Sequence, residues 1–132
     1  MADLIRDLKW EHVVILDRLR EAKELGVTSA EGQDALKRAK KMLVAHMRKE
    51  DFLFYPALRR DAESDNRLKQ LIDSFEEDMR AISKNAHDFF EVYRAGGSEY
   101  AFTKDFSDLY TKIWQRQEKE ESVLYAEYEK RH

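Results

Sequence analysis

The feature that most constrains the fold is a stripe of mainly apolar positions, spaced alternately by three and four, that recurs in four segments of the chain. Turn-forming stretches at residues 26–29, 61–65 and 95–98 separate the segments. This spacing keeps one face of a helix against a neighbouring helix. The stripes consist of Ile5, Leu8, His12, Ile15, Leu19 and Ala22; Leu36, Ala39, Leu43, His46, Glu50, Leu53 and Ala57; Leu68, Ile72, Phe75, Met79, Ile82, Ala86, Phe89 and Tyr93; and Phe106, Leu109, Ile113, Arg116, Glu120 and Val123. The pattern predicts an all-α fold, an antiparallel up-down-up-down four-helix bundle.

Length and composition fit one such bundle. A chain of 132 residues can bury one substantial core, so we expect a single domain over residues 1–132. The composition is 39% charged with one proline, which suits helices with ionised outer faces and short connections. The net charge of −3 provides no positive field for nucleic acid phosphates or anionic lipid. We therefore expect no nucleic acid or membrane partner, and instead an ion, a small molecule or a protein.

The sequence also bears on location and on metal chemistry. The first residues carry charges where a signal peptide needs an apolar stretch, and no segment approaches the roughly 18 to 20 apolar residues of a membrane span. A cytoplasmic location is the expectation. The chain has no cysteine, which excludes disulfides, iron–sulfur clusters and thiolate zinc sites. Any metal ion must therefore be bound by histidine, aspartate or glutamate.

Five ionisable residues interrupt the apolar stripes: His12, His46, Glu50, Arg116 and Glu120. In neighbouring antiparallel helices, residues at one level mirror each other about the connecting turn. Mirroring about the first turn places His46 level with His12. Mirroring about the second turn places Phe75 level with Glu50, and mirroring about the third turn places Glu120 level with Phe75. The same two steps place Arg116 level with His46. The sequence thus predicts that all five lie in one layer of the bundle.

Burial of these groups is costly unless they compensate one another, because an unpaired buried charge costs roughly several kcal/mol. Two solutions are compatible with the pattern. A divalent cation would neutralise Glu50 and Glu120, with the imidazoles of His12 and His46 as nitrogen ligands. Alternatively, Arg116 would pair with one carboxylate or bridge both without any metal.

The segment His46-Met-Arg-Lys-Glu50-Asp-Phe-Leu-Phe-Tyr-Pro56 resembles the His-x-x-x-Glu segment of hemerythrin and its bacterial HHE-type relatives. The Glu11-His12 pair is similar to the first ligand segment of that family. A second stretch, from Arg116 to Tyr125, repeats the shape of the segment that begins at His46. The resemblance implies a four-helix bundle with non-haem iron in its core.

The resemblance also implies which half of a two-metal site is present. In the family, two histidines and two bridging carboxylates hold one metal. These positions match His12, His46 and Glu50 together with Glu120 or Glu121, of which Glu120 lies on the apolar stripe. Three further histidines hold the second metal, and the matching positions here are Phe75, Met79 and Arg116. We therefore expect a mononuclear site for iron, or for zinc or manganese where iron is scarce.

These residues lead to a functional expectation with two rivals. The first hypothesis is a hemerythrin-like metal-binding protein that senses oxygen or redox state or handles iron, with a small diatomic or anionic ligand at the metal. Because reversible oxygen carriage in the family uses both irons, an oxygen carrier is not expected. The second is a metal-free structural or protein-interaction bundle in which Arg116 replaces the metal. The third is an enzyme with one iron, in which Arg116 stabilises a bound anion such as superoxide.

Overall fold

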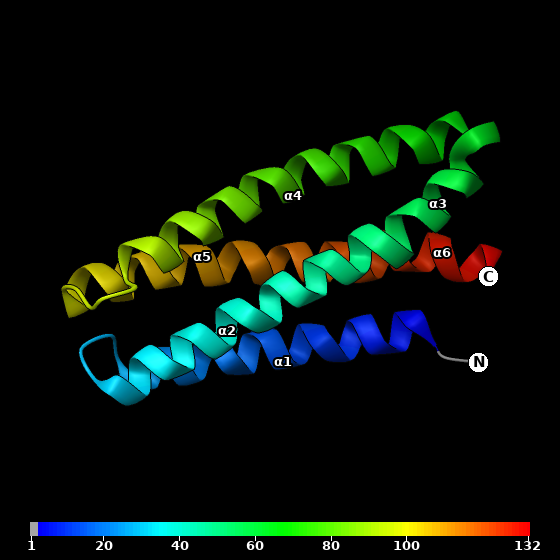
Figure 1. The fold of residues 1–132 in the computed structure, drawn as a ribbon. Helices are drawn as coiled ribbons and strands as arrows, with labels where there is room; N and C mark the ends of the chain where they lie inside the picture. Colours follow the sequence, from blue (N-terminus) through cyan, green and yellow to red (C-terminus); the bar gives the residue numbers. More distant parts are fainter. Residues whose placement is uncertain (1–2) are drawn as a thin grey trace.

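The computed structural model describes residues 3–132, which form four long helical rods and no strand (Figure 1). The rods are α1 (Leu4–Leu25); α2 (Ala30–Lys49) continued by η1 (Glu50–Phe54) and α3 (Tyr55–Asp61); α4 (Asn66–Val92); and α5 (Glu99–Lys119) continued by η3 (Glu120–Leu124) and α6 (Tyr125–Arg131). A short 3₁₀ turn, η2 (Ala62–Ser64), joins the second rod to the third. The predicted all-α four-helix bundle is confirmed. No helix within residues 3–132 is both long and apolar enough to cross a bilayer.

Short polar side chains begin the four rods, and those of the last three rods lie at the predicted turns. Asp3, Ser29, Asp65 and Ser98 each accept a hydrogen bond from the backbone N–H three residues further on, which satisfies one of the free donors of a helix start. The first turn folds tightly over the start of α2, where a Cβ added to Gly32 would lie 1.6 Å from the carbonyl oxygen of Gly26. The sequence therefore defines the ends of the rods by local hydrogen bonds and close packing.

The apolar core consists of two clusters with a polar layer between them. One cluster lies toward the α1–α2 and α4–α5 turns, and in α1 it begins at Ile15. The other lies toward α3 and α6, and in α1 it ends at Leu8. His12 falls in the interval between them. The same interval occurs in the second rod, between Leu43 and Phe54, and in the fourth rod, between Ile113 and Leu124.

Two π-helical turns, η1 and η3, shift the apolar stripe by one residue. The sequence pattern predicted that Leu53 points inward, and this was wrong: Leu53 is 56% exposed, whereas Phe54 is fully buried. In the fourth rod, Leu124 likewise takes the core position predicted for Val123, which is half-buried. A π turn closes i→i+5 hydrogen bonds, as from the N–H of Tyr55 to the carbonyl of Glu50, and so inserts one residue. The α-helical spacing does not anticipate this insertion.

Candidate metal centre

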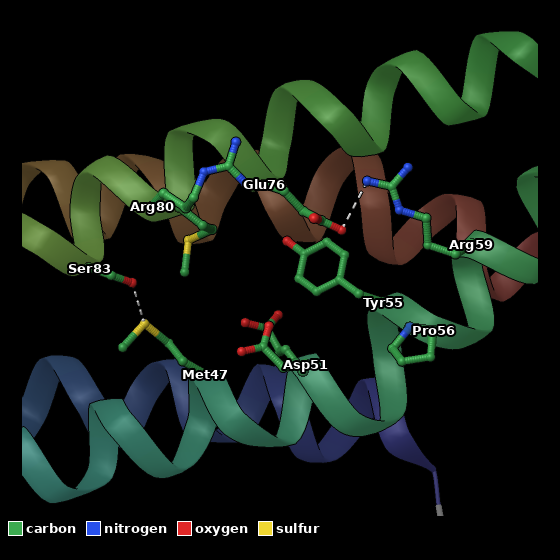
Figure 2. Close-up of a pocket in the computed structure, with 10 residues that line it drawn as sticks. Met47, Asp51, Tyr55, Pro56, Arg59, Glu76, Arg80 and Ser83 are labelled. Atoms are coloured by element: carbon green, nitrogen blue, oxygen red, sulfur yellow. Dashed lines mark hydrogen bonds and ion pairs between the residues drawn. The ribbon is translucent and has the colours of Figure 1, made fainter.

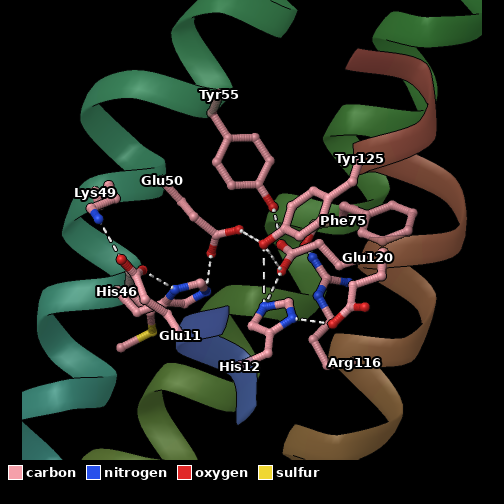
Figure 3. A network of polar contacts seen from close by, with 12 residues as sticks. Glu11, His12, His46, Lys49, Glu50, Tyr55, Phe75, Arg116, Glu120 and Tyr125 are labelled. Carbon is pink, nitrogen blue, oxygen red and sulfur yellow. Dashed lines mark hydrogen bonds and ion pairs between the residues drawn. The ribbon is translucent and has the colours of Figure 1, made fainter. Parts of the chain in front are cut away.

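Four side chains meet in the polar layer, from α1, α2, η1 and η3 (Figure 3). They are His12, His46, Glu50 and Glu120, and each is between 1% and 3% exposed. One nitrogen or carboxylate oxygen from each residue lies within 4.8 Å of all the others. Residues separated by more than a hundred positions are thus brought within the span of a single coordination sphere.

The two histidines direct the same nitrogen toward the centre. The Nδ1–H of His12 donates to Oε2 of Glu121 at 2.7 Å, and the Nδ1–H of His46 donates to Oε1 of Glu11 at 2.7 Å. Glu11 is itself held by the ammonium group of Lys49. Because a carboxylate only accepts hydrogen bonds, each Nδ1 carries a proton and each Nε2 faces inward. This is the arrangement that prepares an imidazole to bind a metal.

The structure separates the roles of the two adjacent glutamates. Glu120 is buried and belongs to the central group, while the carboxylate of Glu121 is one-third exposed and contacts the outer nitrogen of His12. Glu11 was not predicted as a site residue. Its signal was its position directly before His12, because neighbouring residues of one helix can face two different partner helices.

Two buried tyrosines orient the carboxylates, and neither was predicted as part of the site. The Tyr125 hydroxyl donates to Glu50 Oε2 at 2.9 Å and lies 3.0 Å from Glu120 Oε1. The Tyr55 hydroxyl donates to Glu120 Oε2 at 3.2 Å. Burial, together with the nearby carboxylates, raises the pKa of both phenols, so they stay protonated donors. The sequence signal for these tyrosines was a spacing of five residues that occurs twice, from Glu50 to Tyr55 and from Glu120 to Tyr125. A π turn places two residues with this spacing on the same face of the helix.

The carboxylates and imidazoles shift one another's protonation. Burial alone lowers the pKa of His46, but Glu50, Glu11 and Glu120 outweigh it and raise this pKa to about 9. Burial and the charge of Glu120 raise the pKa of Glu50 to about 7. Burial also opposes ionisation of Glu120, yet its contacts with His12 and Glu50 leave its pKa lowered. The cluster therefore attracts positive charge to its centre.

Two atoms of the cluster face each other without forming a hydrogen bond. Within residues 3–132, His46 Nε2 and Glu50 Oε1 are buried without a hydrogen-bond partner, and they lie 3.3 Å apart. Unsatisfied buried polar atoms are rare in folded proteins and need an explanation. Imidazole nitrogen and carboxylate oxygen are suitable ligands for iron, zinc or manganese, so these residues fit a bound metal ion.

Comparison with known families identifies the chain. The family described as the hemerythrin HHE cation binding domain matches residues 2–128. The chain belongs to this family. No curated protein and no solved structure matched the chain in the corresponding comparisons. The buried His/Glu group that could hold a metal thus lies inside a hemerythrin domain that covers nearly the whole chain.

The hemerythrin domain places Arg116 differently from the metal-free hypothesis. That hypothesis expected the guanidinium on Glu50, Glu120 or both. In the described chain, Arg116 Nη2 instead donates to the carbonyl of Phe75 at 2.5 Å, and Nη1 lies 3.6 Å from Asp78 Oδ2. The guanidinium also stacks over the Phe75 ring, 4.2 Å from its centroid. The reason is the ring at position 75, whose face and backbone carbonyl hold the cation beside α4.

Two cavities of this hemerythrin domain adjoin the site. A small one of about 20 Å³ lies among the four clustered side chains, with Arg116 in its wall. A larger one of about 690 Å³ opens between α2–η1–α3 and α4, where Arg59 and Glu76 form an ion pair near its rim (Figure 2). Met47, Glu50 and Met79 line both cavities. Flexible methionine side chains therefore separate the site from an open cleft.

Proposed function

We propose that this hemerythrin domain binds one iron ion through His12 Nε2, His46 Nε2, Glu50 and Glu120, and that it senses oxygen or redox state at that ion. The observation that carries the proposal is the buried pair His46 Nε2 and Glu50 Oε1 within the four-residue group, which lie 3.3 Å apart but make no hydrogen bond to each other or to any other described residue. A bound cation would satisfy both atoms and would neutralise two carboxylates that otherwise repel each other.

A single ion rather than two is favoured by the side chains at the second metal position of the family. Phe75 is buried there, Met79 is half-buried, and neither offers a nitrogen or a carboxylate. Arg116 adds a fixed positive charge that opposes a second cation. Reversible oxygen carriage, which uses both irons in the family, is therefore not part of the proposal.

The residues around the proposed ion have definable tasks. Glu121 and Glu11 hold the two imidazoles in one tautomer and one orientation. The hydroxyls of Tyr55 and Tyr125 hold the carboxylates in place. Iron would supply a Lewis acid and one-electron redox chemistry at this point. The two apolar clusters cover this layer on either side, and of the four proposed ligands Glu50 also borders the open cleft.

Metal analysis of protein purified without chelator tests the proposal. We expect about one iron per chain in the natural sequence and none in His46→Ala. The matched control is His87→Ala, because His87 is exposed on α4 and outside the site, so that variant should keep its iron. A metal-free natural protein whose unfolding temperature ignores chelators would overturn the proposal.

Exposure of the anaerobic ferrous protein to oxygen tests the sensing role. We expect oxygen to oxidise the single iron, and removal of oxygen should not reverse this oxidation. Absorbance spectroscopy monitors the reaction. A reductant should then restore the ferrous spectrum. Reversible oxygenation without oxidation would instead indicate a carrier, and an unreactive ferrous protein would contradict sensing.

A further inference from the structure

We propose that Arg116 and the ion together form a subsite for a small anion, so that the ion takes an anionic ligand in preference to a neutral one. This inference rests on the proposed function, since it requires a metal ion at His12, His46, Glu50 and Glu120. It assigns to Arg116 a positioning role for the ligand.

The first observation is the incomplete hydrogen bonding of the guanidinium. Arg116 is 6% exposed, and among the described residues its Nε and Nη1 have no hydrogen-bond partner. A guanidinium has five N–H donors, and the one hydrogen bond here is from Nη2 to the Phe75 carbonyl. The Asp78 carboxylate, at 3.6 Å, is beyond hydrogen-bond length, and its side chain is 56% exposed. Buried charged donors are therefore left available.

The second observation is the location of the small cavity. Arg116 lines the same space of about 20 Å³ as the four proposed metal ligands. The remaining walls of this cavity are mostly apolar, among them Ile15, Leu43 and Ile113, with the buried amide of Gln117 as the polar exception. A space of this size holds about one water-sized group, and the proposed ion would itself fill it. A small anion between the ion and the guanidinium therefore requires the flexible side chain of Met79, which lines both this cavity and the larger one, to move aside.

The third observation is the balance of charge. A divalent ion and the carboxylates of Glu50 and Glu120 sum to zero, and the imidazoles add no charge when they act as ligands. The guanidinium of Arg116 then remains as a buried positive charge, opposed by the half-exposed carboxylate of Asp78. Because this guanidinium is buried, its attraction for an anion is stronger than it would be in water.

The test compares an anionic and a neutral probe on the full, iron-loaded chain. Azide is titrated into the ferric form, and nitric oxide is titrated into the ferrous form. Absorbance and calorimetry measure the binding. Arg116→Met should weaken azide binding by about tenfold or more, as loss of a hydrogen bond to a charged group predicts, and leave nitric oxide binding within about twofold. Lys119→Met is the matched control, because it also removes one positive charge near the Phe75 ring, but Lys119 is exposed. It should change neither affinity.

The outcomes separate the inference from the proposed function. If the natural protein takes up no iron, the proposed function itself fails. If iron binds and Arg116→Met and Lys119→Met bind azide equally well, the anion subsite is overturned. If Arg116→Met does not fold, Arg116→Lys keeps the charge but lacks the Nε donor. Azide affinity several-fold below the natural value would then support the subsite, and an unchanged affinity would overturn it.

Discussion

At the scale of single residues, the two buried histidines are alike in their surroundings although they belong to different helices. Each has its outer nitrogen on a carboxylate, that of Glu121 for His12 and that of Glu11 for His46. Each has its inner nitrogen near a buried glutamate. The site is therefore built from a central carboxylate and an outer carboxylate for each imidazole, and the two kinds of carboxylate should respond differently to substitution.

A comparison of Glu120→Gln with Glu121→Gln checks this distinction. Glu120→Gln should abolish iron binding, because an inner charged ligand is replaced by a neutral amide. Glu121→Gln should weaken iron binding by roughly 10- to 100-fold, because the histidine loses its orienting acceptor but the inner ligands remain. Both affinities are measured by competition with a chelator. A larger loss in Glu121→Gln than in Glu120→Gln would reverse the assignment.

At the scale of elements, the π turns η1 and η3 are the local structures that complete the site. Each turn begins with an inner glutamate and ends before a tyrosine, and each tyrosine contacts the glutamate of the other turn. The turns thus couple the second rod to the fourth through the polar layer. Such single π turns within α-helices commonly occur at functional sites.

Tyr125→Phe tests the contribution of these tyrosine contacts. The change removes the donor to Glu50 and Glu120 but keeps the ring that packs against Phe54 and His12. Iron affinity should fall by about tenfold with the helical content unchanged, as judged by chelator competition and circular dichroism. Tyr110→Phe, a half-buried position bonded to Arg20, is the control and should leave iron affinity unchanged.

The docking of α6 depends on a titratable contact. Arg131 and Arg67 both donate to the Glu127 carboxylate, and the hydrogen bond from Arg131 holds the pKa of Glu127 below its usual value against the effect of burial. A lowered pKa contributes stability above the unfolded value of 4.5, and this contribution is lost as the pH falls through the folded value. Arg67 lies in α4, so the contact ties the last helix to the third rod.

Glu127→Gln should therefore lower the free energy of unfolding by about 1 kcal/mol at pH 7, and the difference from the natural protein should shrink steadily below pH 4.5. Urea unfolding at several pH values measures it. Glu129→Gln removes a neighbouring charge at an exposed position and should have almost no effect. A difference that persists unchanged at pH 3 would contradict the electrostatic explanation.

At the scale of the whole molecule, two apolar clusters enclose one polar layer. The clusters supply the stability of the bundle, while the layer between them gathers ionisable groups that favour a cation. A ligand that binds only the folded state adds its binding free energy to stability. At a free iron concentration about a thousandfold above the dissociation constant, binding would add roughly 4 kcal/mol to the free energy of unfolding.

Removal of iron should accordingly lower the unfolding temperature by roughly 10 °C, given the size of the domain. Differential scanning calorimetry with and without chelator measures the shift. The chelator should have no effect on His46→Ala, because we expect this variant to bind no iron. An equal shift in both proteins would mean that the chelator acts elsewhere.

The sequence by itself determined the helical rods, their turns and the level of the polar layer. These follow from local properties: the spacing of apolar residues, the short capping side chains, and the fact that antiparallel helices mirror each other about their turns. The positions of His12, His46, Glu50 and Glu120 on their stripes therefore follow from the sequence alone.

Only the tertiary structure decided which groups contact these residues. Glu11, Tyr55 and Tyr125 reach the site through packing between rods. Arg116 lies on Phe75 and beside Asp78 rather than on Glu50 or Glu120. The π turns also could not be predicted from the sequence pattern. The inserted residue exposes Leu53, but the apolar spacing on either side of the turn stays regular. The physical reason is that periodicity along one helix specifies a face, whereas side-chain partners and small helical insertions depend on the three-dimensional fit between helices.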